Sequence, residues 1–245
     1  MNNSIKISSI ETLGTHEGPG IRFVIFTQGC NFKCLYCHNP ETQCINSKSE
    51  EYSVAELVEK IKKCKPYFGK EGGVTISGGE PILQAKKIIR LFSELKKAGI
   101  HTALDTNGSI LTDDVEKLLK ITGLVLLDIK HIDNEWHKKI SGHSNELVLK
   151  FAEYLEKNNI KFWIRYVLVP NLSDQDEFLI QFSEHFKDYK NLERVEILPY
   201  HTLGISKYKE LNIPYSLLKT PVPDEKLIKK AKDIFEKCFN KVVVR

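Results

Sequence analysis

Residues 18–39, GPGIRFVIFTQGCNFKCLYCHN, join a run of apolar residues to three closely spaced cysteines. The run at residues 21–27, IRFVIFT, does not alternate apolar with polar residues, which favours a strand buried on both faces. Cys30, Cys34 and Cys37 follow within eight residues of one another. The stretch therefore predicts a strand of a parallel sheet that leads directly into a metal-binding loop.

Further short apolar runs alternate with longer amphipathic stretches along the chain. We expect strands at residues 73–77, 101–105, 124–130, 161–169 and 194–200, and a short last one at 241–245. This alternation is typical of a parallel sheet with helical crossovers, either an open sheet or a barrel. No repeat or composition shift marks a second domain, so residues 1–245 are expected to form one domain. Residues 217–224, with Pro221 and Pro223, are interpreted as a turn or linker.

The expected helices carry start and stop signals. Ser53 and Glu56 form a capping box, and Gly99 is placed to end a helix. Thr112, Asn145 and Ser173 are candidate first caps of three more helices.

Composition indicates a globular protein, with 41% hydrophobic and 28% charged residues. Lys and Arg exceed Asp and Glu by 36 to 32, a mild excess that does not indicate a nucleic-acid partner. The first residues lack a basic stretch followed by an apolar run, and no window approaches the roughly 18 apolar residues that cross a bilayer. We therefore expect a cytoplasmic protein without a membrane partner.

The six cysteines are expected to be ligands or core residues rather than disulfides, because the cytosol keeps thiols reduced. Cys64 and Cys238 fall on apolar helical stripes and are predicted to be small core residues. Cys44 lies in a polar loop and has no assigned role.

Cys30, Cys34 and Cys37 are separated by three and two residues, a spacing that lets one tight loop wrap a metal cluster. Iron–sulfur clusters are held by cysteine and a cubane normally takes four, so three ligands leave one iron open to another ligand. An open metal position indicates a catalytic rather than a structural metal site. The alternative is a zinc site completed by His38, because three cysteines and one histidine can close a tetrahedron.

Polar residues and glycines lie late in the expected strands or just past them. In a parallel α/β barrel the loops after the strands build the working site, so these residues are expected to share one rim. They are Cys30, Gly78, Gly79, Asp105, Asp128, Lys130, Arg165 and His201.

The cysteine spacing, with Tyr36 directly before the last cysteine, resembles the signature of the radical S-adenosylmethionine (radical SAM) superfamily. The longer stretch is similar to the extended signature of the branch that activates glycyl radical enzymes, on Gly18, Gly20, Arg22, Phe26, Gly29 and Asn39. VTISGGEPILQ, LDTNG, LLDIK, WIRYVLVP and ILPYHTLG follow in the order of the small members of this branch. The resemblance covers nearly the whole chain.

The resemblance implies a partial (β/α)6 TIM-like barrel with a parallel sheet, holding a 4Fe-4S cluster and S-adenosylmethionine. An electron from the cluster would cleave S-adenosylmethionine to methionine and a 5′-deoxyadenosyl radical, which takes hydrogen from a glycine of formate acetyltransferase. Flavodoxin or ferredoxin is the expected electron donor to a monomeric enzyme working without oxygen. The alternatives are another glycyl radical enzyme as partner, or a small-molecule reaction such as one on a deazaguanine precursor.

The resemblance also implies a set of residues that bind S-adenosylmethionine. Gly78 and Gly79 would approach its amino group with their backbone while Glu80 fixes the turn, although two glycines alone would indicate only a turn. Lys130 and Arg165 would hold its carboxylate or ribose, the alternative being a buried ion pair with a strand-end aspartate. The full set is Tyr36, Cys37, His38, Gly78, Gly79, Glu80, Asp128, Ile129, Lys130, Arg165 and His201.

Other implied roles concern a cation, the adenosyl group and the substrate. Asp105, Thr106, Asp128 and the Leu126 carbonyl would bind a monovalent cation, unless the carboxylates cap helices or pair with Lys130.

His201 would lie near the adenosyl group, although by itself it would be an ordinary loop histidine. Tyr36 and His38 would line the adenine and cluster pocket, with hydrophobic shielding as the alternative for Tyr36. Glu17 replaces a frequent aspartate near the expected position of the substrate glycine.

Overall fold

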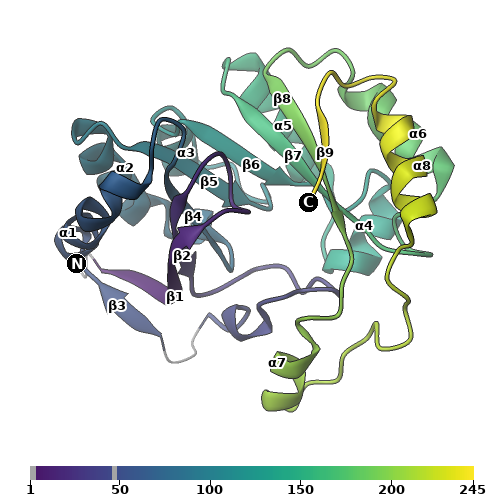
Figure 1. Cartoon of the computed structure of the whole chain (residues 1–245), viewed down its shortest axis with the longest axis horizontal. Helices are drawn as coiled ribbons and strands as arrows, with labels where there is room; N and C mark the ends of the chain where they lie inside the picture. The colour runs from purple at the N-terminus through teal and green to yellow at the C-terminus, as the bar shows by residue number, and fades with distance from the viewer. Residues whose placement is uncertain (1–3, 46–48) are drawn as a thin grey trace. The chain divides into compact units, whose positions relative to one another are not determined.

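The computed structural model describes residues 4–45 and 49–245, which form two compact units (Figure 1). The first unit contains residues 4–31, 42–45 and 49–126, and the second contains residues 32–41 and 127–245. The cysteine motif is divided between them, with Cys30 in the first unit and Cys34 and Cys37 in the second. The prediction of a single domain stays a prediction.

The first unit contains a sheet with strand order β3-β1-β2-β4-β5. Strands β2, β4 and β5 are parallel neighbours, whereas β1 is antiparallel to both β2 and β3. Helices α1, α2 and α3 lie side by side (Figure 1). The strands are β1 (Ile5–Gly14), β2 (Arg22–Thr27), β3 (Glu50–Tyr52), β4 (Gly73–Gly78) and β5 (His101–Thr106), and the helices are α1 (Val54–Cys64), α2 (Ala85–Lys97) and α3 (Asp113–Leu119), with short 3-10 turns at Lys65–Tyr67 and Pro81–Gln84.

The second unit contains the parallel strands β7, β8 and β9 in that order. Helices α6 and α8 pack together through Phe182 and Phe235, whose ring centroids are 5.1 Å apart. Helix α7 lies away from β7 and β8 at the tip of an extended segment (Figure 1). The elements are α4 (Asn134–Ser141), α5 (Glu146–Lys157), β7 (Phe162–Leu168), α6 (Asp176–Phe186), β8 (Leu192–Pro199), α7 (Ile205–Glu210), α8 (Glu225–Phe235) and β9 (Val242–Val244), while β6 (Leu124–Asp128) runs from the first unit into the second and a 3-10 turn covers Pro40–Thr42.

All the strands expected from the apolar runs are present, with ends within two residues of the prediction. The predicted α/β class with a mostly parallel sheet is therefore confirmed. The sequence interpretation missed the antiparallel strands β1 and β3 and the short helices α4 and α7. In the described residues no helix combines the length and apolar composition needed to span a bilayer.

Most of the helix signals are correct. Ser53 and Glu56 form both hydrogen bonds of a capping box, and Gly99 follows α2 with a φ of +64°. Thr112 and Asn145 precede α3 and α5, although neither side chain forms a capping hydrogen bond. Cys64 and Cys238 are partly buried, and Cys44 is exposed.

Ser173 is not a helix cap, and that prediction is wrong. Helix α6 begins at Asp176, preceded by Gln175 as its first cap. The Ser173 hydroxyl instead accepts a hydrogen bond from the Val169 amide and donates one to the Val167 carbonyl. The serine therefore closes the turn that follows β7.

Arg22 is fully buried at the start of β2. Its guanidinium donates hydrogen bonds to the carbonyls of Pro19 and Val74 and to the Thr75 hydroxyl. Burial lowers the pKa of Arg22 to about 10, an effect that Glu17 opposes, so the side chain stays charged at neutral pH. Arg22 thus holds the turn before β2 against β4.

The Thr75 hydroxyl donates a hydrogen bond to the Glu17 carbonyl. Thr75 lies in the first half of β4, whereas Gly78 ends that strand. The backbone of Glu17 is therefore held away from the strand end that carries the predicted site residues. The expected position of Glu17 near the substrate glycine stays a prediction.

Replacing Arg22 with leucine is expected to lower the free energy of unfolding by about 3 kcal/mol, because buried carbonyl and hydroxyl groups lose their charged donor. Urea unfolding followed by circular dichroism measures this change. The control Arg90→Leu alters an exposed arginine of α2 and should cost less than about 0.5 kcal/mol. Equal losses in the two variants would contradict the role given to Arg22.

Candidate active site

In the first unit the predicted site residues lie at the carboxyl ends of neighbouring parallel strands. Because β2, β4 and β5 pair in register, their ends fall on one edge of the sheet. The residues at this edge are Cys30 after β2, Gly78, Gly79 and Glu80 at the end of β4, and Asp105 and Thr106 at the end of β5. For this unit the predicted common rim is observed.

Glu80 ties the loop after β4 to the loop after β5. Its buried carboxylate accepts hydrogen bonds from the Thr106 hydroxyl and from the amides of Asn107 and Ile82. Burial raises the pKa of Glu80 to about 7, while these hydrogen bonds act in the opposite direction. The Glu80 side chain thus fixes the turn after β4, as the family resemblance implied.

Gly78 and Gly79 are packed against the loop that leads to Cys30. Gly78 has a φ of +106°, a conformation that favours glycine. A Cβ atom on Gly79 would lie 2.1 Å from the Gly29 carbonyl oxygen, and the Glu80 amide donates to that same oxygen. The glycines are therefore required by close backbone packing, and their approach to a cofactor stays a prediction.

Asn31 is a structural residue of the rim that the sequence interpretation missed. Its side-chain amide donates to the Ser109 hydroxyl, and its side-chain oxygen accepts from the Asn107 side chain. These bonds join the residue after Cys30 to the loop after β5. Asn107 of the LDTNG motif was a signal for a polar contact at this rim. The motif alone does not show that Asn31 is the residue it contacts.

Asp105 accepts a hydrogen bond of 2.7 Å from the Ser77 hydroxyl inside the first unit. The Thr106 hydroxyl is engaged with Glu80. Among the described residues no group of three or more His, Cys, Asp or Glu side chains is arranged to hold a metal ion. The predicted cation site also draws Leu126 from the first unit and Asp128 from the second, and it stays a prediction.

In the second unit the loop that carries Cys34 and Cys37 is held by the end of helix α4. The amides of Lys33 and Leu35 donate to the carbonyls of Ser141 and Ile140, at 3.0 and 2.9 Å. The last carbonyls of a helix lack partners within the helix, so the loop supplies them. Helix α4, absent from the sequence interpretation, therefore positions the loop.

Phe32 fixes the same loop through aromatic packing. Its buried ring stacks on His143 with a centroid distance of 4.9 Å and meets the His137 ring edge-on at 5.7 Å. Burial and stacking of this kind hold a ring in one orientation. Phe32 therefore anchors the residues between the first and second cysteines to α4 and the turn after it.

The surroundings of Cys34 fit a thiolate bound to a metal cluster. Burial raises the pKa of the Cys34 thiol to about 12, although the nearby Lys130 lowers it. Cys34 is only partly exposed to solvent, and a thiolate in this position needs positive charge beside it, which a bound iron would supply. The soft sulfur donors and their protected position thus suit an iron–sulfur cluster.

Lys130 is buried and forms an ion pair with Asp128, with 2.6 Å between Nζ and Oδ2. Burial alone would lower its pKa, but Asp128, Tyr36 and Cys34 raise the pKa of Lys130 well above its usual value. Its ammonium also lies 5.9 Å from the centre of the Tyr36 ring. The pairing of Asp128 with Lys130, one of the alternatives from the sequence, is therefore observed.

Ile129 and Arg165 meet through their backbones on neighbouring elements. The Ile129 amide donates to the Arg165 carbonyl at 3.2 Å, and the Ile129 side chain is fully buried. Arg165 lies in the middle of β7 rather than at its end. The binding of a cofactor by either residue stays a prediction.

The structure brings His38 and His201 together although 162 residues lie between them. Their ring centroids are 3.9 Å apart with an interplanar angle of 32°. Burial is the main cause that lowers the pKa of His38 to about 4, and it also lowers the pKa of His201. Both rings are therefore neutral at pH 7.

The segment after His201 packs on the residues that follow Cys37. A Cβ atom on Gly204 would lie 3.2 Å from the Cα atom of His38. Lys207 donates to the Asn39 side chain at 2.8 Å and to Glu41 at 2.6 Å. Helix α7 is thereby fixed beside the cysteine loop.

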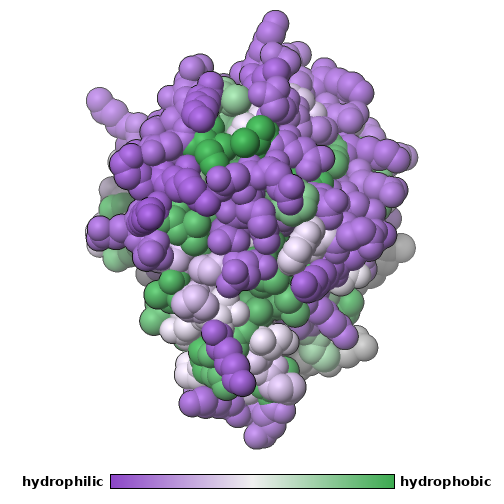
Figure 2. All heavy atoms as spheres, turned by 90° about the vertical axis from the view of Figure 1, so that its right-hand side faces the viewer, coloured by the Kyte–Doolittle hydropathy of each residue, from purple (hydrophilic) through white to green (hydrophobic). Residues whose placement is uncertain are grey.

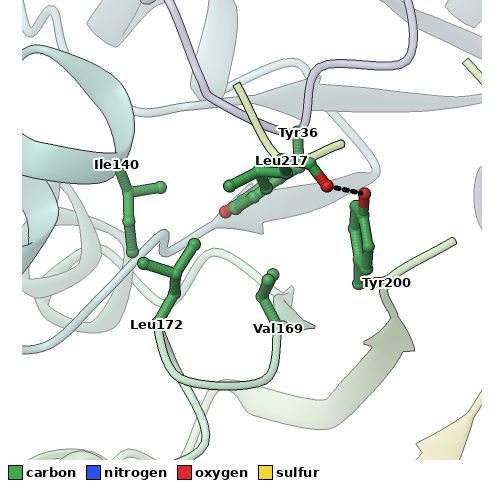
Figure 3. Close-up of a cluster of buried hydrophobic side chains, with 6 residues drawn as sticks. All are labelled: Tyr36, Ile140, Val169, Leu172, Tyr200 and Leu217. Carbon is green, nitrogen blue, oxygen red and sulfur yellow. Dashed lines mark hydrogen bonds between the residues drawn. The ribbon is translucent and has the colours of Figure 1, made fainter. Parts of the chain in front are cut away.

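Tyr36 is buried in a cluster of hydrophobic side chains from several parts of the second unit (Figure 3). The Tyr36 hydroxyl has no hydrogen-bond partner in the described part of the chain, whereas the Tyr200 hydroxyl donates to the Leu217 carbonyl. The cluster consists of Tyr36, Ile140, Val169, Leu172, Tyr200 and Leu217. This environment fits the shielding alternative, and the adenine-binding role of Tyr36 stays a prediction.

Comparison with known proteins identifies the class of the chain. Residues 24–183 match the model of the radical SAM superfamily. The chain is 48% identical over 232 residues to the pyruvate formate-lyase-activating enzyme of Staphylococcus epidermidis and 47% identical to that of Staphylococcus aureus strain USA300, with 92% of each chain covered. It belongs to the radical SAM superfamily and, within it, to the family of the pyruvate formate-lyase-activating enzymes. It is therefore an enzyme.

Solved structures share its fold. A domain of pyruvate-formate lyase-activating enzyme from Bacteroides vulgatus has a TM-score of 0.61 and 24% identity, covering 71% of this chain and 99% of that domain. Streptococcus suis SuiB bound to precursor peptide SuiA has a TM-score of 0.69 and 17% identity over 92% of this chain. This chain spans about half of SuiB, 49% of its length. These similarities confirm the predicted α/β fold.

Phe32→Ala is expected to lower the free energy of unfolding by about 3 kcal/mol, because it empties the space between His137 and His143. Thermal or urea unfolding measures the loss. The control Leu147→Ala removes an exposed leucine of α5 and should change stability by less than about 0.5 kcal/mol. A Phe32→Ala variant as stable as the control would show that the ring does not anchor the loop.

His131 and His137 make the protein sensitive to acid. Both side chains are fully buried, and burial lowers the pKa of each to about 4. The Asp133 amide donates to Nδ1 of His131, while Nδ1 of His137 lies 2.6 Å from the His143 carbonyl. The folded chain thus excludes protons that the unfolded chain binds below pH 6.5.

The free energy of unfolding is expected to fall as the pH drops from about 6.5 to 4, by up to about 3 kcal/mol for each of these two histidines. The stability they contribute is fully present above pH 6.5. Urea unfolding at a series of pH values measures the slope. His131→Gln should reduce the slope and His16→Gln, at an exposed histidine, should not; equal slopes in both variants would refute the assignment.

Proposed function

We propose that this enzyme activates formate acetyltransferase, also called pyruvate formate-lyase, by installing a radical on one of its glycines. The observation that carries the proposal is the 48% identity over 92% of both chains with a pyruvate formate-lyase-activating enzyme. The intact three-cysteine motif and the second-unit loop held by α4 support it. The chemistry of this family uses an iron–sulfur cluster and S-adenosylmethionine.

In this proposal Cys30, Cys34 and Cys37 hold a 4Fe-4S cluster with one open iron for S-adenosylmethionine. A cluster held there would supply the one electron needed to cleave S-adenosylmethionine, and the 5′-deoxyadenosyl group released with methionine would take a hydrogen atom from the substrate glycine. The chain's own part is to bind, orient and shield these groups.

Positive charge beside the cysteine loop is one contribution of the chain. Lys130, held charged by Asp128, compensates the negative charge of the Cys34 thiolate. Arg165, on β7, is proposed to hold the carboxylate or ribose of the cofactor, because a guanidinium binds planar anions well. The other residues proposed to bind S-adenosylmethionine are Tyr36, Cys37, His38, Gly78, Gly79, Glu80, Asp128, Ile129, Lys130 and His201.

Exclusion of water is a second contribution. Tyr36 and the apolar cluster around it cover one side of the loop between Cys34 and Cys37. A dry environment protects a radical from side reactions. Asp105, Thr106, the Leu126 carbonyl and Asp128 are proposed to bind a monovalent cation, since hard oxygen atoms suit such an ion.

The proposed setting is anaerobic cytoplasm, with flavodoxin or ferredoxin as electron donor and a monomeric enzyme. A one-electron donor is required because the cleavage of S-adenosylmethionine consumes one electron per turnover.

The test is anaerobic reconstitution with iron and sulfide, followed by incubation with S-adenosylmethionine, dithionite and formate acetyltransferase. A glycyl radical doublet in the electron-spin resonance spectrum is expected, with about four irons per chain. Cys34→Ala should lose the cluster and the doublet. The control Cys44→Ala alters an exposed cysteine outside the motif and should keep both.

Three outcomes would contradict the proposal. Binding of one zinc without sulfide would favour the closed zinc site with His38. A doublet with a different glycyl radical enzyme, and none with formate acetyltransferase, would change the partner. Formation of 5′-deoxyadenosine without a doublet in any partner, but with turnover of a small molecule, would place the enzyme among the small-molecule radical SAM enzymes.

A further inference from the structure

Residues 203–222 present an exposed apolar surface, here called the 203–222 surface. Leu203 is 80% exposed and Leu218 is 66% exposed, which is high for large apolar side chains. The complete set of exposed large apolar residues in this stretch is Leu203, Leu211, Ile213, Leu218 and Val222. In Figure 2, green and pale atoms lie between purple ones in the lower part of the molecule, the height at which α7 lies in Figure 1.

The other face of this stretch is firmly attached to the second unit. Tyr208 and Leu217 are buried, and the Tyr208 and Tyr215 rings meet edge to face at 4.8 Å. The Tyr215 hydroxyl donates to the Tyr200 hydroxyl, which donates to the Leu217 carbonyl. The stretch is therefore a folded element, and its outward apolar side chains are held in place rather than left over from a loose loop.

This surface begins next to the cysteine loop. Gly204 lies against the backbone of His38, and Lys207 is bonded to Asn39 and Glu41. Leu217 belongs to the same buried cluster as Tyr36. The stretch that carries the 203–222 surface thus contacts the residues on both sides of Cys37.

We infer that the 203–222 surface docks the protein that carries the substrate glycine. This inference rests on the proposed function, because the reacting atom is then the α carbon of a glycine within a folded protein. Such an atom can reach the residues around Cys37 only if the partner's own surface covers their surroundings. Exposed apolar patches of this kind mark sites of protein interaction.

The chemistry of the surface favours the substrate protein over an electron carrier. Electron-transfer encounters use small interfaces, and charge steers their association. Here five apolar side chains are exposed, while the charged residues are three lysines and one glutamate, and Lys207 is already paired with Glu41. The matching partner has an apolar face around its glycine loop, with acidic groups opposite Lys209 and Lys219.

The test compares the double variant Leu218→Asp/Val222→Asp with the wild-type chain, using formate acetyltransferase as substrate. The KM for the whole partner is expected to rise about tenfold or more with little change in kcat, because buried charge weakens the apolar contact. Cleavage of S-adenosylmethionine with dithionite alone should stay unchanged. A short peptide carrying the glycine sequence should also react as with the wild type, since it does not cover the 203–222 surface.

Two further variants test whether a change in KM is specific to the 203–222 surface. Leu211→Asp is an independent change in the same surface and should raise the KM in the same direction. Ile180→Asp alters a side chain that is 51% exposed on α6 of the same unit and should leave the KM unchanged. Iron content and circular dichroism establish that each variant is folded and loaded.

The outcomes separate this inference from the proposed function. If the wild-type chain forms no glycyl radical, both fall. If it does and the double variant keeps the wild-type KM, only the docking inference falls. The inference also falls if the double variant instead slows reduction by flavodoxin, or converts a dimer to a monomer, without a change in KM.

Discussion

Two hydrogen bonds from the amides of Lys33 and Leu35 to the final carbonyls of α4 set the position of the loop with Cys34 and Cys37. The other contacts of that loop depend on this attachment. Phe32 can stack on His143, Tyr36 can enter its apolar cluster, and His38 can meet His201 only while the loop keeps this course. A metal centre needs its ligands held with small tolerance, and backbone hydrogen bonds to a helix end give that precision.

The first unit meets the same need with a carboxylate. Glu80 binds the loop after β5 through Thr106 and Asn107, and its own amide binds the Gly29 carbonyl just before Cys30. One residue therefore connects the ends of β2, β4 and β5. Its neighbours Gly78 and Gly79 lack side chains, which lets these backbones approach closely. In both units backbone groups near the cysteines take part in the contacts that hold the loops.

The sequence predicted the parallel strands well because each is a continuous apolar run, and it placed the rim residues because they follow those runs. It missed β1, although Ile5 and Ile7 alternate with polar residues, and it missed α4, which is short and largely polar. The N-cap at Asp133 and the terminal Gly142 were readable signals of that helix. Spacing alone carries no information on the contact of His38 with His201, which are distant along the chain; only the family resemblance placed both near the adenosyl group. The 217–224 stretch, interpreted as a turn or linker, does begin in a turn, and it also contributes Leu217 to the core.

The separation along the chain between the cysteine loop and its packing partners affects how the protein is made. Leu217 leaves the ribosome 180 residues after Cys37, roughly 10–40 s later at ordinary rates of translation. During that interval Cys34 is without the complete apolar cluster on which it later packs, and His38 is without its partner His201. If the cysteines hold the proposed cluster, iron and sulfide would reach a protected environment only after these later residues are made, and the thiols of a nascent chain would be most open to oxidation before then.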